Sequence, residues 1–179
     1  MSTDVNFSSY AQQSGLVIED REFRPTPGVA IADTLKFSGA HDCTVRRCQS
    51  WGGLENAIDL NNGCTNILIE NTVLHGGDQA AIVVKGGCRD ITLRRVGIDP
   101  VPSAWCDILW DDFSDQSHRQ STGLLEEVTR LDGKPVRLVC GRFSRPQIAG
   151  GNVRLCYFYS LGLILYNLGK IALRGLRIV

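Results

Sequence analysis

The chain has 179 residues, 43% of them hydrophobic, and no net charge, because 19 basic residues balance 19 acidic ones. This length fits a single domain with a continuous core, and the balanced charge argues against nonspecific nucleic-acid binding. No apolar run is long enough to span a membrane, and the first residues do not have the pattern of a secretory signal. We therefore expect a protein that is made in the cytoplasm and has neither nucleic acid nor a membrane as partner.

The first residues lack any apolar period. Residues 1–15 are mostly polar and cannot bury much surface by themselves, so they predict a flexible N-terminal arm that is either disordered or ordered on a partner. The first strand is expected at 16–18, and the first full turn of the fold at about 29–51. A β-domain is predicted for 16–158.

From Gly52 onward the sequence repeats itself at a constant offset of 24. The coinciding positions are the glycine pairs 52–53 and 76–77, Ala57/Ala81, Ile58/Ile82, Gly63/Gly87, Cys64/Cys88, Ile67/Ile91 and Ile69/Leu93. The preceding unit aligns with offsets of 23 and 24, through Leu35/Ile58, Phe37/Leu60, Cys43/Ile67 and Val45/Ile69. A fixed period of this size indicates a stacked repeat architecture.

Each unit holds two short runs in which alternate residues are apolar, separated by glycine-rich corners, and contains no helical run. This pattern predicts an all-β solenoid, a right-handed parallel β-helix of about five to seven rungs. Equivalent residues should stack on one another from rung to rung, with Ile58 on Ile82 and Cys64 on Cys88.

Beyond Val96 the period lengthens. Cys106, Ile108 and Trp110 return at an offset of 26 from Ala80, Ile82 and Val84, after an insertion that contains two prolines. A long polar loop is expected at 111–118, further strands within 123–128, 136–140 and 153–157, and a turn at 131–135.

The last residues change to a helical period. From 161 to 177 polar residues recur at steps of three and four, opposite a wide apolar face, so 159–179 predicts an amphipathic helix. The helix either caps the last rung, docks another subunit or lies on a membrane surface. Lys170, Arg174 and Arg177 form its basic stripe and are the candidate docking surface.

Seven cysteines are an odd number, and several occupy inward positions of the repeat. They are interpreted as reduced core residues and not as a disulfide framework. No Cys-x-x-Cys pair is present, and Cys64 and Cys88 lie one rung apart, so a zinc site is not favoured. We expect neither a metal nor a cofactor.

The stretches 71–82 and 85–93 resemble rungs of the pectin-lyase-like superfamily, which includes polygalacturonases, and the resemblance extends over about 29–98. It implies paired aspartates at one corner, where one carboxyl donates a proton and the other activates water. Here Asp78 is followed by Gln79, so that catalytic pair is not carried over. Asp78 is interpreted as a turn residue, and His75, the equivalent of Trp51, as a corner residue.

Lyases of the superfamily use calcium-binding aspartates, and Asp111, Asp112 and Asp115 offer suitable oxygen ligands in a loop that is otherwise simply solvated. The short coil and the missing pair resemble small structural proteins of phages more than sugar-cleaving enzymes. The leading hypothesis is therefore a non-enzymatic virion protein of a tailed phage, a head-decorating (cement) or tail accessory protein that docks to capsid or tail proteins through its terminal extensions.

Two alternatives remain open. The first is a polysaccharide lyase or hydrolase that uses Asp78 or the aspartates at 111–115. The second is a carbohydrate-binding β-helix with Trp51 and Trp105 as stacking platforms. The oligomeric state is open between a monomer and a homo-oligomer.

Overall fold

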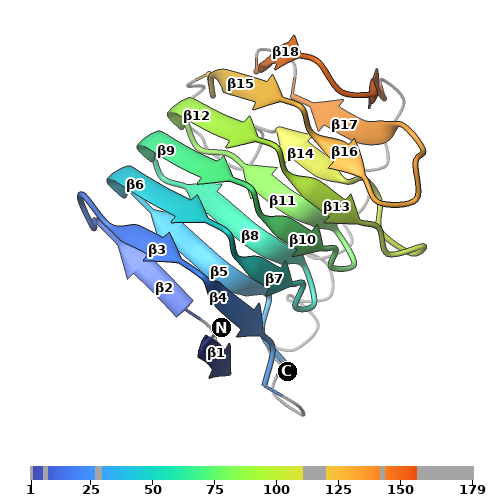
Figure 1. Cartoon of the computed structure of the whole chain (residues 1–179). Helices are drawn as coiled ribbons and strands as arrows, with labels where there is room; N and C mark the ends of the chain where they lie inside the picture. The colour runs from blue at the N-terminus through green and yellow to red at the C-terminus, as the bar shows by residue number, and fades with distance from the viewer. Residues whose placement is uncertain (1, 6–7, 27–29, 111–119, 142–143, 157–179) are drawn as a thin grey trace, which may run out of the picture.

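The structure, a computed structural model, describes residues 2–5, 8–26, 30–110, 120–141 and 144–156. Regular structure in these ranges is β-strand throughout, arranged in three parallel sheets of six, seven and six strands. Up to the last strand, the chain visits the sheets in a fixed order, so that each complete rung of the coil takes one strand from each sheet. Figure 1 shows the rungs side by side, from the blue N-terminal strands to the orange C-terminal ones. The predicted parallel β-solenoid is confirmed.

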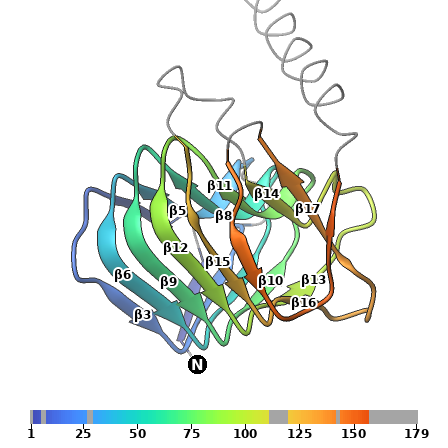
Figure 2. The same cartoon turned by 90° about the horizontal axis from the view of Figure 1, so that it is seen from above.

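The three sheets are named A, B and C. Sheet A contains β1 (Ser2–Val5), β4 (Arg21–Arg24), β7 (Gln49–Trp51), β10 (Val73–His75), β13 (Gly97–Asp99) and β16 (Thr129–Arg130). Sheet B contains β2 (Ser8–Ala11), β5 (Asp33–Ser38), β8 (Asn56–Asn61), β11 (Ala80–Val84), β14 (Ile108–Trp110), β17 (Val136–Cys140) and β19 (Val153–Leu155). Sheet C contains β3 (Val17–Glu19), β6 (His41–Arg46), β9 (Thr65–Glu70), β12 (Arg89–Arg94), β15 (Gly123–Glu126) and β18 (Gln147–Ala149). In Figure 2 the strands of sheet C form one wall of the coil.

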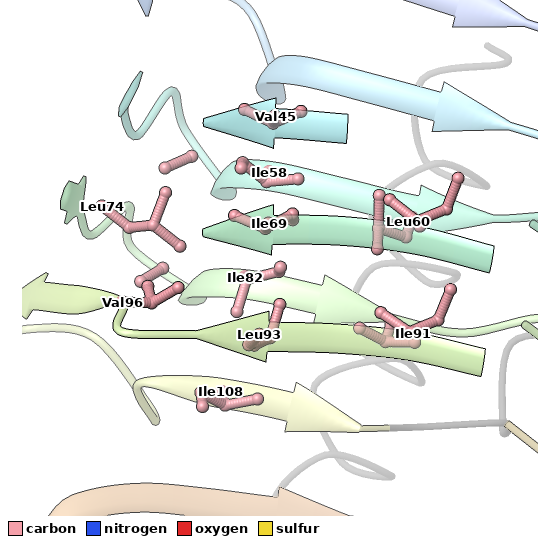
Figure 3. Close-up of a cluster of buried hydrophobic side chains, with 14 of the residues drawn as sticks. Val45, Ile58, Leu60, Ile69, Leu74, Ile82, Ile91, Leu93, Val96 and Ile108 are labelled. Atoms are coloured by element: carbon pink, nitrogen blue, oxygen red, sulfur yellow. The ribbon is translucent and has the colours of Figure 1, made fainter. Parts of the chain in front are cut away.

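The core consists of ladders of equivalent apolar residues. In sheet B, Ile82 pairs with Ile58 on one side and with Ile108 on the other, and all three side chains are fully buried. Figure 3 shows them one above another on successive strands. The predicted pairings of Leu35 with Ile58 and of Ile67 with Ile91 are also present. The sequence repeat therefore set the register correctly.

Sheet A was not predicted. The repeat unit was expected to hold two strands, but a third strand, in sheet A, follows every strand of sheet C except β18. Most strands of sheet A have only two to four residues and send a single side chain inward, such as Phe23, Ser50, Leu74 or Ile98. One inward residue gives no alternation, so the sequence period does not reveal these strands.

The N-terminal prediction requires a correction. Residues 1–15 were expected to be a flexible arm, but β1 pairs with β4 and β2 pairs with β5, and they continue sheets A and B. Tyr10 pairs with Phe37 and stacks on its ring, with centroids 5.3 Å apart. Backbone pairing with an existing rung stabilises this polar segment, although it has little apolar surface of its own.

The corner between sheets C and A carries a charge ladder, which we define as Glu19, Arg46, Glu70, Arg94 and Glu126. Each of these residues is the register partner of the next, so acidic and basic side chains alternate from rung to rung. Arg46 lies 2.7 Å from Glu19, and Arg94 lies 2.6 Å from Glu126. The ladder consequently favours one register of the stacked rungs.

The residue after each member of the ladder turns the corner with a positive φ. Arg47, Asn71 and Arg95 have φ values of 52°, 49° and 50°. Asparagine tolerates this left-handed conformation, but for arginine it is uncommon. Contacts between rungs offset the strain, because Arg47 pairs with Asp20 at 2.7 Å and Arg95 donates to the Asn71 side chain at 2.7 Å.

Several predictions lie outside the described residues: the polar loop at 111–118, the end of the coil at 157–158 and the C-terminal helix at 159–179 with Lys170, Arg174 and Arg177. Among the residues that are described, no helix has the length and apolar character needed to cross a membrane.

Candidate functional site

The outer face of sheet B holds a group of polar residues, four of them buried and two partly exposed, which we name the β8 cluster. Its members are Asp33, Lys36, Asn56, Asp59, Asn61 and Lys85. Along β8, Ile58 and Leu60 point into the core, so Asp59 between them points to the opposite face. That face is covered as well, since the exposed fraction of Asp59 is 0%.

Asp59 is held by three donors that share one carboxylate oxygen. Its Oδ2 lies 3.1 Å from Lys36 Nζ and 3.3 Å from Lys85 Nζ, and it accepts a hydrogen bond of 2.9 Å from the Asn61 amide. The two lysines come from the rungs on either side, and their side chains remain partly exposed. They neutralise a buried charge that would otherwise be costly.

A second carboxylate belongs to the same cluster. Asp33 Oδ2 lies 3.4 Å from Lys36 Nζ, and Asp33 Oδ1 accepts a hydrogen bond of 2.8 Å from the Asn56 amide. Burial, together with the negative charge of Asp59, raises the pKa of Asp33 above its usual range. Lys36 therefore bridges two carboxylates that differ in environment: Asp59 has two lysine partners and Asp33 has one.

Three acceptor atoms in the cluster have no hydrogen-bond partner among the described residues. They are Asn56 Oδ1, Asp59 Oδ1 and Asn61 Oδ1, and all three belong to β8. Their residues are at most 7% exposed. A buried acceptor without a donor costs about 1–3 kcal/mol, so the hydrogen-bonding capacity of the cluster is only partly satisfied.

The repeat pattern does not reveal this cluster. The resemblance to polygalacturonases directed attention to adjacent aspartates, whereas Asp33 and Asp59 are brought together from different rungs. One signal was present: Asp59 occupies the position that is Val83 in the next unit. A charged residue inside an otherwise apolar strand requires a specific partner, and here the partners are Lys36 and Lys85.

A buried aspartate elsewhere on the chain provides a contrast. Asp107 is 1% exposed, and its two oxygens accept hydrogen bonds from the Arg137 guanidinium and backbone and from Arg130, at 2.7–3.2 Å. Every acceptor is satisfied, which is the arrangement expected of a purely structural ion pair. Asp59 differs, because its Oδ1 has no hydrogen-bond partner among the described residues.

The second polar group lies on the outer face of sheet A, along the ends of β4, β7, β10 and β13. Arg24 lies over the ring of Trp51 at 3.5 Å, and His75 stacks on the same ring with centroids 4.2 Å apart. His75 Nδ1 is 2.9 Å from Asp99 Oδ2, and His75 Nε2 is 3.2 Å from Gln49 Oε1. The rungs before and after Trp51 therefore cover both faces of its indole, which leaves only its edge to a sugar ring.

The other predicted site residues are more dispersed. Asp78 is exposed and accepts a hydrogen bond of 3.4 Å from Ser103. Gln79 accepts one of 3.2 Å from Asn56, which connects this corner to the β8 cluster. Trp105 packs against a second apolar group that includes Val83 and Leu109. Asp111, Asp112 and Asp115 lie outside the described residues.

Five of the seven cysteines are buried, whereas Cys140 and Cys156 are partly exposed. All seven are free, and Cys64 and Cys88 are fully buried, one rung apart. The contact with the Cys64 thiol and burial raise the pKa of Cys88, which keeps it protonated at neutral pH. Within the part of the chain that the structure describes, no three His, Cys, Asp or Glu residues are grouped so that they hold a metal ion.

Comparison with known proteins identifies no relative: no family model matches the chain, and no significant match is found among curated proteins or solved structures. The geometry of the described residues is therefore the basis for assigning a function.

Proposed function

We propose that this chain is a non-enzymatic structural protein of a tailed-phage virion, either a head-decorating (cement) protein or a tail accessory protein. One observation supports this role: the polar side chains on the outer faces of sheets A and C bind one another between rungs. The charge ladder and the stack of Arg24, Trp51 and His75 are examples. Such contacts rigidify a particle component.

Docking is assigned to the terminal segments. We propose that the coil is a right-handed β-helix of the pectin-lyase-like type and that residues 159–179 form an amphipathic helix that caps it. Lys170, Arg174 and Arg177 would then be available to acidic surfaces on capsid or tail proteins. Because residues 2–5 and 8–11 form strands, the N-terminal segment contributes as part of the first rung.

Quantitative mass spectrometry of purified virions tests this role. A copy number close to that of the major capsid protein places the chain on the head, whereas about a dozen copies place it on the tail. A particle-binding assay then compares the variant K170Q/R174Q/R177Q with R89Q, a matched control on the exposed end of β12. The triple variant should lose binding and the control should keep it. Absence of the chain from virions would overturn the proposal.

A second candidate function, carbohydrate binding or cleavage, is favoured by the β8 cluster. The cluster brings two carboxylates in different environments, Asp33 and Asp59, to the same lysine, Lys36. In a hydrolase, Asp33 with its raised pKa would be the proton donor and Asp59 the charged partner.

The test is a panel of capsular and pectic polysaccharides, assayed for binding and for new reducing ends. If the site cleaves, D33N and D59N should abolish turnover, while D90N serves as the control because Asp90 is exposed on β12 and lies outside the cluster. Binding without cleavage would indicate a binding module. No binding by the wild-type protein would exclude both alternatives.

A further inference from the structure

The two ends of the coil differ in how well their core is covered. At the N-terminal end, Ile18 is 4% exposed and Phe23 is fully buried. At the other end, Ile148 is 49% exposed, although its register partner Leu125, one rung below, is fully buried. Val153 and Leu155 are also partly exposed above Val136 and Leu138. Within the described residues, the apolar core is therefore open at its C-terminal end.

We propose that residues 157–179 of the same chain fold back over this open end, with their apolar face on Ile148, Val153 and Leu155 and their basic stripe outward as a docking surface for an acidic partner. The proposal that this segment covers the C-terminal end of the coil does not depend on the virion function. The docking role of the basic stripe rests on the proposed virion function.

The place where residues 157–179 leave the coil supports the proposal that they cover its open end. β19 pairs with β17 at the end of sheet B, so the chain leaves the described coil at Cys156, beside the open core. A helix over 161–177 would be about 25 Å long at 1.5 Å per residue. The longest strands have six residues, about 20 Å. The helix is therefore long enough to cross the end of the coil.

The composition of the segment indicates that it needs a surface. Gly162, Gly169 and Gly175 lie within it, and glycine lowers helix propensity, so a helix of this length would be marginal in isolation. Its apolar residues recur on one face. They are Leu161, Ile164, Leu165, Leu168, Ile171, Ala172 and Leu176. The open end offers an apolar surface adjacent to the start of the segment.

The test places a charge on each side of the proposed contact in the full-length chain. L165D should lower Tm by several degrees and increase the binding of a hydrophobic dye, and I148D should do the same. N167D adds the same charge on the polar stripe and is the matched control, with an unchanged Tm. In the double variant I148D/L165D the losses should not add, because both substitutions break one contact.

Three results would overturn the covering. They are an unchanged Tm in both single variants, fully additive losses, or a wild-type dimer that L165D converts to a monomer, which would mean that a second copy covers the end. If L165D fails to fold, I148D alone decides, since its side chain is half exposed in the described coil. K170Q/R174Q/R177Q with unchanged Tm and unchanged particle binding would reject the docking role and leave the covering intact.

Discussion

Trp51 and His75 belong to successive repeats of the chain, and their rings stack with an interplanar angle of only 7°. The contact follows from the repeat, because Trp51 and His75 are register partners on β7 and β10. Asp99, one rung further, continues the column by pairing with His75. A surface residue in this fold therefore finds its partner one repeat away, where a helix would supply a partner three or four residues away.

Removing the indole should destabilise the fold. W51A eliminates both the stack with His75 and the contact with Arg24, and we expect a loss of about 1–2 kcal/mol in the free energy of unfolding. Urea denaturation measures it. L54A is a suitable control because Leu54 is 57% exposed, and it should change stability by less than about 0.5 kcal/mol. Equal effects of the two variants would show that the stack contributes nothing.

The repeated glycine pair predicts a sharp difference between neighbouring positions. A Cβ at Gly77 would lie 2.4 Å from the Glu55 carbonyl oxygen, whereas one at Gly76 would be no nearer than 3.4 Å to any neighbour. G77A should therefore cost about 2–3 kcal/mol. G76A should be tolerated within about 0.5 kcal/mol. Chemical denaturation of both variants checks this, and equal stabilities would refute the close approach of the rungs at this corner.

The β8 cluster predicts a pH dependence with a defined sign. Burial and the charge of Asp59 raise the pKa of Asp33 in the folded protein above 3.8, so the folded state holds this proton to a higher pH than the unfolded chain does. At low pH, Asp33 is protonated in both states and does not destabilise the fold. Its contribution to the free energy of unfolding then falls as the pH rises through the folded-state pKa.

D33N carries no titrating proton at this position. The unfolding free energy of the wild type minus that of D33N should therefore decrease from pH 3 to pH 7. Urea denaturation of both proteins across this range measures the difference. Groups that titrate in the same way in both proteins do not contribute to it. An increase with pH would mean that the attraction of Lys36 outweighs burial at Asp33.

The charge ladder predicts a salt-dependent loss. R94E places three acidic residues in succession on neighbouring rungs, because Glu70 and Glu126 flank position 94. The denaturation midpoint should fall at low ionic strength, and the loss should shrink at 1 M salt, where screening acts within about 3 Å. R89E is the control, since its register partner Thr65 is uncharged. A loss that is independent of salt would point to packing.

Most strands of sheets B and C, and their register, could be predicted from the sequence. Alternating apolar residues such as Ile58 and Leu60 define both the strands and their register, because a residue on one rung must fit its equivalent on the next. Sheet A escaped prediction because one inward side chain per strand, as with Leu74, makes no pattern. β1 and β2 escaped because their strand structure comes from pairing with β4 and β5.

The candidate site was harder to predict for a related reason. Asp33 and Asp59 belong to different rungs, and only the register of β5 and β8 brings both to Lys36. A sequence repeat consists of residues that are alike from rung to rung, whereas the site consists of residues that depart from the repeat. Asp59, which replaces the valine of the next unit, is such a break.

The charge ladder also limits how a coil of this kind changes length. Apolar stacking repeats at every rung, but the signs of the charges repeat only at every second rung, as Arg46 and Arg94 on either side of Glu70 show. Loss or duplication of one rung would leave the core matched and place arginine beside arginine or glutamate beside glutamate. Two rungs gained or lost together keep both patterns in phase. The unit by which this coil lengthens or shortens without electrostatic conflict is therefore a pair of rungs.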